Sequence, residues 1–303
     1  MTVALLDADL LAGTPLPRLS PSSDKEERGA VLVVAGGGAV PGAAVLTGRA
    51  ALRAGAGKLQ VVATRRLLGP LGAVLPEAAM LCVPETRRFE IALPSAPCAA
   101  ALAAHAGSVV IGPGMAPRKT PRRFARRLME AWPFLPMVVD AAALPSPSEA
   151  EIFSRLANGR VVLTPHAGEM ARLLDLSREA VLADPLAMAR EAASRLQSVV
   201  VMKGATTFVA TPSGLVWRHP GGVAGLATSG SGDVLAGLIA GFMARGASPL
   251  QAAQWGVYIH AAAGRRLASN IGPLGFLASE LPDQVPGLLD EVSSAPEGTI
   301  PAG

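Results

Sequence analysis

The residue types best suited to chemistry lie in one short segment, residues 227–237, which reads ATSGSGDVLAG. Gly230 and Gly232 allow a tight turn and the close approach of a ligand to the backbone. The apolar run that follows predicts a helix, whose free N–H groups would form an anion site at the turn. We predict that Asp233, in the first turn of this helix, is a general base and the central catalytic group. Gly230 and Ser231 would supply the supporting anion hole.

A structural role is the alternative for Asp233. A carboxylate in the first turn of a helix gains about 0.3–1 kcal/mol from the helix dipole. Simple capping does not need a glycine on both sides of the turn, however, so we favour the catalytic interpretation.

A second candidate segment ends a buried, β-branched run with a lysine, a glycine and two hydroxyl residues (VMKGATT, residues 201–207). Lysine and hydroxyl groups can donate to the phosphates of a nucleotide. An ordinary exit from a strand into a turn is the alternative. The phosphate interpretation is favoured because Asp233 follows thirty positions after Lys203.

A third segment, residues 163–169, reads LTPHAGE. Pro165 disfavours helix at Thr164, so a strand should end there and a helix should start after His166. Glu169 would then lie in the first turn, where a capping role is as reasonable as a functional one. His166, at the carboxyl end of a strand, is a candidate for substrate contact.

Glycines also follow two earlier apolar runs, in GGGAVPGA at residues 36–43 and in GPG at residues 112–114. The first resembles a dinucleotide fingerprint but lacks the G-x-G-x-x-G register, and no acidic residue lies near position 60, where the ribose ligand is expected. The sequence therefore gives only weak support to a Rossmann fold.

Short β-branched runs at 30–34, 59–63, 108–111, 137–140, 160–163 and 199–202 predict buried parallel strands. Helical patterns occupy 43–54, 167–174, 185–196, 231–244, 249–268 and 278–290. This alternation predicts an α/β fold with a parallel sheet covered on both faces, and ligands bound beyond the carboxyl ends of its strands. We predict one domain over residues 29–290, with an irregular lead over 1–28 and a disordered tail over 291–303.

Composition excludes several classes of protein. The net charge of the 303 residues is only +4, and the basic run at 118–127 carries a single aromatic residue, Phe124. We therefore expect a solvated helix face there rather than a nucleic-acid site. Cys82 and Cys98 have no metal or disulfide spacing and are expected to be buried, inert thiols. No signal peptide and no apolar run of about 20 residues is found, so we expect a cytoplasmic protein with no membrane contact.

These segments, in this order, resemble the ADP-dependent NAD(P)H-hydrate dehydratase family of the ribokinase-like superfamily. The likeness covers about residues 25–290 and is carried by the early Pro-Gly-Ala segment, TPHAGE, Lys203-Gly204 and GSGD. It implies a ribokinase-like three-layer α/β/α fold with a mostly parallel central sheet. It also implies the ADP-dependent return of hydrated NADH or NADPH to NADH or NADPH, a repair reaction.

The resemblance also assigns roles to residues. Contacts with hydrated NAD(P)H would come from Ala43, Gly114, His166 and Asp233. Contacts with ADP would come from Lys203, Gly204, Ala205, Thr206, Thr207 and Gly232. It further implies Mg²⁺ as a phosphate clamp without dedicated metal ligands, and a homo-oligomer, a tetramer in the family. The epimerase domain often fused to this family is not expected in the 28 residues before the first strand.

Two positions depart from the family's pattern, and two other functions stay open. The family commonly has Asp-Ala-Asp-Ala-Leu-Asn where this chain has Ala142 and Pro145 in place of the second acid and the asparagine. Leu274 replaces the usual arginine of an Arg-Gly pair.

A ribokinase-like kinase of a small molecule, such as a vitamin precursor, would share Asp233 and the anion hole. A non-catalytic nucleotide-binding regulator is the other alternative.

Overall fold

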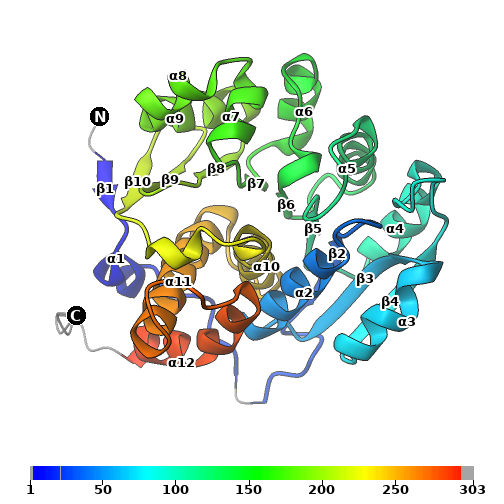
Figure 1. Cartoon of the computed structure of the whole chain (residues 1–303), viewed down its shortest axis with the longest axis horizontal. Coiled ribbons are helices and arrows are strands. Elements are labelled where there is room, and N and C mark those ends of the chain that lie inside the picture. The colour runs from blue at the N-terminus through cyan, green and yellow to red at the C-terminus, as the bar shows by residue number, and fades with distance from the viewer. Residues whose placement is uncertain (1–2, 21, 295–303) are drawn as a thin grey trace.

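A single mixed sheet forms the centre of the computed structural model, which describes residues 3–20 and 22–294 (Figure 1). Within these residues the strand order is β1-β10-β9-β8-β7-β6-β5-β2-β3-β4. The strands are β1 (Val3–Leu5), β2 (Ala30–Val34), β3 (Lys58–Thr64), β4 (Ala78–Val83), β5 (Ser108–Ile111), β6 (Met137–Val139), β7 (Val161–Leu163), β8 (Val199–Met202), β9 (Thr207–Ala210) and β10 (Val216–His219).

The strands from β8 to β4 pair in parallel, whereas β9 is antiparallel to both β8 and β10. All five residues of β2 are buried, as expected for a strand covered on both faces. Its side chains alternate between two cores: Val31 and Val33 face one, while Leu32 and Val34 face the other.

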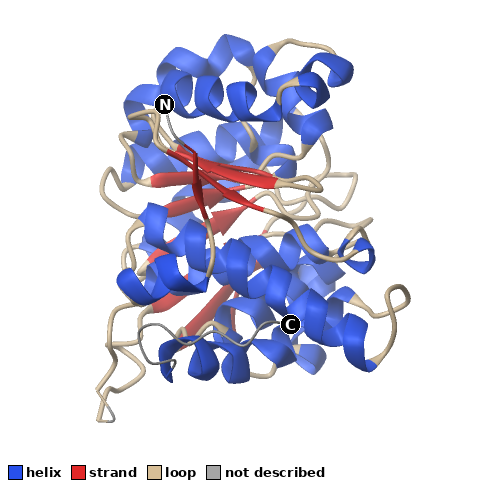
Figure 2. Cartoon of the chain, turned by 90° about the vertical axis from the view of Figure 1, so that its left-hand side faces the viewer, coloured by secondary structure: helices blue, strands red, loops and turns tan. Residues whose placement is uncertain are grey.

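Helices cover both faces of the sheet and complete three layers (Figures 1 and 2). One layer contains α1 (Ala8–Gly13), α2 (Gly42–Arg53), α3 (Arg65–Val74), α10 (Ser231–Ala244), α11 (Pro249–Asn270) and α12 (Leu281–Ser294). The other contains α4 (Ala96–Ala103), α5 (Lys119–Ala131), α6 (Ala150–Ala157), α7 (Ala167–Leu174), α8 (Arg178–Ala183) and α9 (Pro185–Leu196). The predicted three-layer α/β/α architecture with a mostly parallel sheet is confirmed.

Close packing of α10 against α2 depends on glycine. A Cβ atom added at Gly237 would lie 2.2 Å from the Thr47 carbonyl oxygen, and one at Gly241 would lie 2.6 Å from the Ala51 carbonyl oxygen. Only glycine permits this approach of the two backbones. The contact sets the start of α10 beside α2, where the Thr47 hydroxyl donates to the Asp233 carbonyl oxygen over 3.2 Å.

The predicted chain ends need correction. The irregular lead contains β1, which pairs in parallel with β10, and α1, which is capped by Asp7. The pairing of β1 joins segments more than 200 residues apart, so no local pattern indicates it. At the other end α12 continues to Ser294, and the rest of the predicted disordered tail lies outside the described residues.

Three further strands and both cysteines also differ from expectation. β4, β9 and β10 were not predicted: β4 lies at the sheet edge with only one of its six residues buried, and β9 and β10 form a hairpin of four-residue strands. The prediction of buried thiols was wrong, because Cys82 and Cys98 are both exposed. No helix of the described residues is long and apolar enough to cross a membrane.

Candidate active site

The carboxyl ends of the central strands bring most of the candidate residues to one edge of the sheet. The chain turns at Gly36 after β2, at Gly112 after β5, at Asp140 after β6, at Thr164 after β7 and at Lys203 after β8. The chain order reverses between the neighbours β2 and β5, and such a switch point opens a crevice in a parallel sheet. The candidate residues thus gather at the edge of the sheet where the sequence predicts that ligands bind.

Asp233 stands at the start of α10, as the sequence predicts. Gly230 precedes the helix with φ +91°, a left-handed conformation that favours glycine, and no side chain caps the helix end. The first N–H groups of a 14-residue helix are therefore left for a ligand. Asp233 lies in the first turn of this helix, where the helix dipole also stabilises a carboxylate, so its catalytic role stays a prediction.

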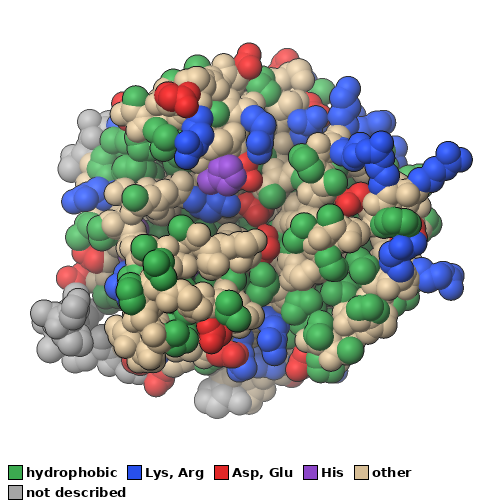
Figure 3. All heavy atoms as spheres, viewed as in Figure 1, with side chains coloured by type: hydrophobic (Ala, Val, Ile, Leu, Met, Phe, Trp, Pro, Cys, Tyr) green, Lys and Arg blue, Asp and Glu red, His purple; other side chains and the backbone are tan. Residues whose placement is uncertain are grey.

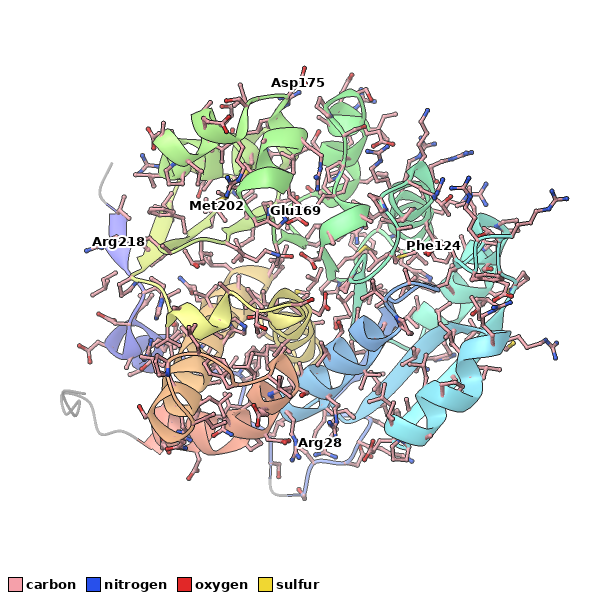
Figure 4. The ribbon with its side chains drawn as sticks, viewed as in Figure 1. Arg28, Phe124, Glu169, Asp175, Met202 and Arg218 are labelled. Carbon is pink, nitrogen blue, oxygen red and sulfur yellow. The ribbon has the colours of Figure 1, made fainter. Side chains whose placement is uncertain are left out.

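A buried ion pair lies next to Asp233. Lys203 Nζ is 3.1 Å from Asp140 Oδ1 and 3.9 Å from Glu169 Oε2. The Thr164 hydroxyl donates to the same Asp140 oxygen over 2.6 Å. These contacts join the ends of β6, β7 and β8 with the start of α7, where Glu169 lies in Figure 4.

Charge and burial shift two pKa values in this cluster. Burial, assisted by the charge of Asp140, raises the pKa of Asp233 from 3.8 to about 6, although Lys203 opposes the shift. Burial alone would lower the pKa of the Lys203 ammonium, but Asp140 and Glu169 outweigh it and raise that pKa above its usual value. Near neutral pH, Asp233 is therefore a carboxylate that takes up a proton more readily than an ordinary aspartate, while Lys203 stays charged.

His166 and Glu169 form a reciprocal cap at the start of α7. His166 Nδ1 accepts from the N–H groups of Gly168 and Glu169, and Glu169 Oε2 accepts from the His166 N–H over 2.9 Å. The capping role considered for Glu169 is therefore present. The His166 side chain remains 56% exposed, and its other ring nitrogen, Nε2, lies 3.4 Å from Glu169 Oε1.

A cavity of about 660 Å³ opens beside the start of α10. Its volume and its mixed walls suit a nucleotide, since such sites combine apolar surface with a few polar groups. Seven of the predicted site residues line it: His166, Lys203, Gly204, Ala205, Thr207, Ser231 and Gly232. Thr206 does not line it. The apolar walls include Val223, Leu226, Leu235 and Val257.

Ala43 and Gly114, the other predicted contacts, lie together but apart from this cavity. A Cβ atom at Gly114 would lie 2.4 Å from the Ala43 Cβ, so the two residues are in direct contact. Ala43 precedes Thr47 by one turn of α2, about 6 Å along the helix, and Thr47 contacts Asp233. Asp233 itself is not among the residues that line the cavity, and its backbone carbonyl oxygen accepts from Thr47, one helical turn from Ala43. Gly230 borders neither the cavity nor the surface at Ala43 and Gly114, and it packs against Leu46.

Sequence reasoning missed His260, which comes from the middle of α11 and lines the cavity. Its Nε2 lies 3.0 Å from the Ser231 carbonyl oxygen and 2.9 Å from the Ser231 hydroxyl. Burial lowers the pKa of His260 to about 4, so the ring is neutral at neutral pH. A carbonyl can only accept, so Nε2 must carry the proton, and the Ser231 hydroxyl hydrogen is left to point toward a ligand.

The comparison with known proteins decides the family. The chain matches the family described as NAD(P)H-hydrate dehydratase over residues 31–287. This chain belongs to the NAD(P)H-hydrate dehydratase family. A similar protein from Xanthomonas campestris, an ADP-dependent (S)-NAD(P)H-hydrate dehydratase, is 47% identical over 291 residues, which cover 96% of this chain and 97% of that protein.

Two further relatives have the same family likeness. A bifunctional NAD(P)H-hydrate repair enzyme from Moorella thermoacetica is 35% identical over 95% of this chain, but only 54% of its own length is matched. The crystal structure of the ADP/ATP-dependent NAD(P)H-hydrate dehydratase from Bacillus subtilis, co-crystallized with ATP and Mg²⁺, superposes with a TM-score of 0.80 at 27% identity. That comparison covers 96% of this chain and 99% of the other.

The two positions after β6 that depart from the expected family pattern border a second cavity. Ala142 and Pro145 line this cavity of about 260 Å³, together with Glu169 and a set of basic residues: Arg118, Lys119, Arg122 and Arg172. The described part of the chain contains no cluster of three or more His, Cys, Asp or Glu side chains able to hold a metal.

Proposed function

We propose that this chain removes water from NADH or NADPH hydrated at C6 of the nicotinamide ring, with ADP as the phosphoryl donor. The observation that carries the proposal is Asp233, a half-buried carboxylate with a pKa of about 6 at a helix start that borders a nucleotide-sized cavity. Family membership and the 47% identical relative support the same activity.

Direct loss of water is difficult because hydroxide is a poor leaving group, and phosphorylation removes this difficulty. Asp233 accepts the proton of the C6 hydroxyl while the hydroxyl oxygen bonds to the β-phosphorus of ADP. The bond from that phosphorus to the bridging oxygen breaks at the same time and releases AMP. The C6–O bond then breaks with loss of phosphate, C5 loses a proton, and the dihydropyridine is restored.

Other residues of the chain bind and orient in this proposal. Lys203, Gly204, Ala205 and Thr207, which line the cavity, hold the ADP phosphates together with Gly232. Ser231 stabilises the transferring phosphoryl group with its hydroxyl, together with N–H groups at the start of α10, and Gly230 supports the turn that precedes them. Mg²⁺, when bound with the nucleotide, neutralises phosphate charge. Ala43, Gly114 and His166 would contact the hydrated dinucleotide.

The decisive experiment incubates the protein with hydrated NADH, ADP and Mg²⁺ and follows the return of NADH absorbance together with the release of AMP and phosphate. A small-molecule kinase would leave the phosphoryl group on its product and release none. A regulator would bind ADP without turnover. A kinase and a regulator would use the same Asp233 and the same cavity. Either outcome would therefore replace the dehydratase proposal without changing the description of the site. A cytoplasmic location and a tetrameric assembly remain predictions.

A further inference from the structure

A separate basic cavity of about 290 Å³ lies between the turn after β4 and the connection from β5 to α5. It shares no lining residue with the nucleotide-sized cavity, so ADP bound there would not occupy it. Three arginines line it, Arg87, Arg88 and Arg118, with Thr120 and a single carboxylate, Glu90. Lysine and arginine side chains also gather on the outer surface where α5 lies (Figure 3).

The turn that presents Arg87 and Arg88 is firmly built. The Thr86 N–H donates to the Glu90 carbonyl oxygen over 2.8 Å, and the Thr86 hydroxyl accepts from the N–H groups of Arg88 and Glu90. Phe89 within the turn adopts φ +64°, a left-handed conformation that a bulky residue keeps only where its surroundings demand it.

The charges of this cavity favour an anion. None of the three arginines forms an ion pair with a carboxylate within the described residues. Glu90 is already engaged, because it accepts from the Ala116 N–H over 3.3 Å and packs against Gly37. Arg118 also stands at the uncapped start of the 13-residue helix α5, whose dipole adds positive potential.

The position of the cavity relates it to the hydrated dinucleotide. Its wall begins at Met115 and Ala116, directly after Gly114, which contacts Ala43. Gly37, in the turn before Ala43, also packs against Glu90 of the cavity, so the arginine-lined cavity adjoins the surface at Ala43 and Gly114. In NADPH the ribose 2′-phosphate lies toward the end of the molecule remote from the nicotinamide ring, and NADH lacks it.

We propose that Arg87, Arg88 and Arg118 bind the 2′-phosphate of hydrated NADPH, so that the chain prefers this substrate to hydrated NADH. The proposal rests on the dehydratase function above. Three guanidinium groups and one carboxylate give the cavity a formal charge of +2, which matches a phosphate monoester of charge about −1.5 to −2. Guanidinium groups bind phosphate oxygens in pairs, which adds geometric selectivity.

The test compares kcat/KM for hydrated NADPH and hydrated NADH in the wild type and in an Arg87→Gln/Arg88→Gln double variant. We expect the double variant to lose about 10-fold or more with hydrated NADPH and less than about 2-fold with hydrated NADH. The wild-type preference should also weaken at high salt. Arg127→Gln, an exposed arginine on α5 outside the cavity, is the matched control and should change neither value.

Titration with NADP⁺ and NAD⁺ measures binding affinity without turnover. The double variant should lose affinity for NADP⁺ alone. An equal loss for both hydrates would overturn the proposal, because it would place the shared diphosphate at the arginines. Equal wild-type efficiency with both hydrates would overturn it too. Turnover of neither hydrate would refute the dehydratase function instead, while tighter binding of NADP⁺ than NAD⁺ would still support a 2′-phosphate site.

Discussion

Replacing Asp233 with asparagine tests the centre of the proposed mechanism. Asparagine keeps the shape of the side chain but cannot accept a proton, so turnover of hydrated NADH with ADP should fall at least about 100-fold. Binding of ADP should survive, because the substitution removes a negative charge beside the phosphates. In the wild type the rate should fall as the pH drops through about 6, where Asp233 becomes protonated.

The same substitution has a predictable effect on stability. The pKa of Asp233 rises from 3.8 to about 6 on folding, and about two pKa units correspond to about 3 kcal/mol. The folded state holds the proton more tightly than the unfolded state, so this group lowers stability as the pH rises from about 4 to 6. Above pH 6 the Asp233→Asn variant should therefore be more stable than the wild type by up to about 3 kcal/mol, and the difference should vanish below about pH 4.

Denaturant unfolding, ADP titration and turnover on one preparation would separate these effects. Asp290→Asn, the same change at an exposed position of α12, is the control and should alter none of them. A variant at Asp233 with near-wild-type turnover would remove this residue from the mechanism. A variant less stable than the wild type at neutral pH would instead contradict the buried charge inferred from the structure.

Three further predictions concern the nucleotide. Lys203→Ala should raise the KM for ADP more than it lowers kcat, and an unchanged KM would exclude the phosphate contact. The same variant should move the acid limb of the pH–rate profile to higher pH, because Lys203 lowers the pKa of Asp233. His260→Ala should lower kcat by about 10-fold because the Ser231 hydroxyl loses its orientation, and His260→Gln, which retains an N–H donor, should recover part of the loss; equal rates for both variants would argue against this positioning role. ADP should support faster turnover than ATP at matched Mg²⁺, and a clear preference for ATP in steady-state assays would refute the assignment as ADP-dependent.

Much of the framework was readable from local sequence. The five-residue apolar run of β2 identified a strand buried on both faces, because only a covered strand has apolar residues on both sides. The glycine before Ser231 and the apolar run after it predicted the helix α10 with Asp233 in its first turn, since left-handed backbone and helix periodicity are local properties. The order of these segments was also sufficient to indicate the family.

Tertiary structure decided what these residues can do. The pKa of Asp233 depends on burial and on Asp140, which lies 93 positions earlier in the chain (233 − 140), and no local pattern contains that information. Asp140 pairs with Lys203 across 63 positions, and His260 reaches Ser231 across 29. Desolvation and charge act through space, so the sequence determined which groups were available, whereas only the fold determined which of them face one another and with what proton affinity.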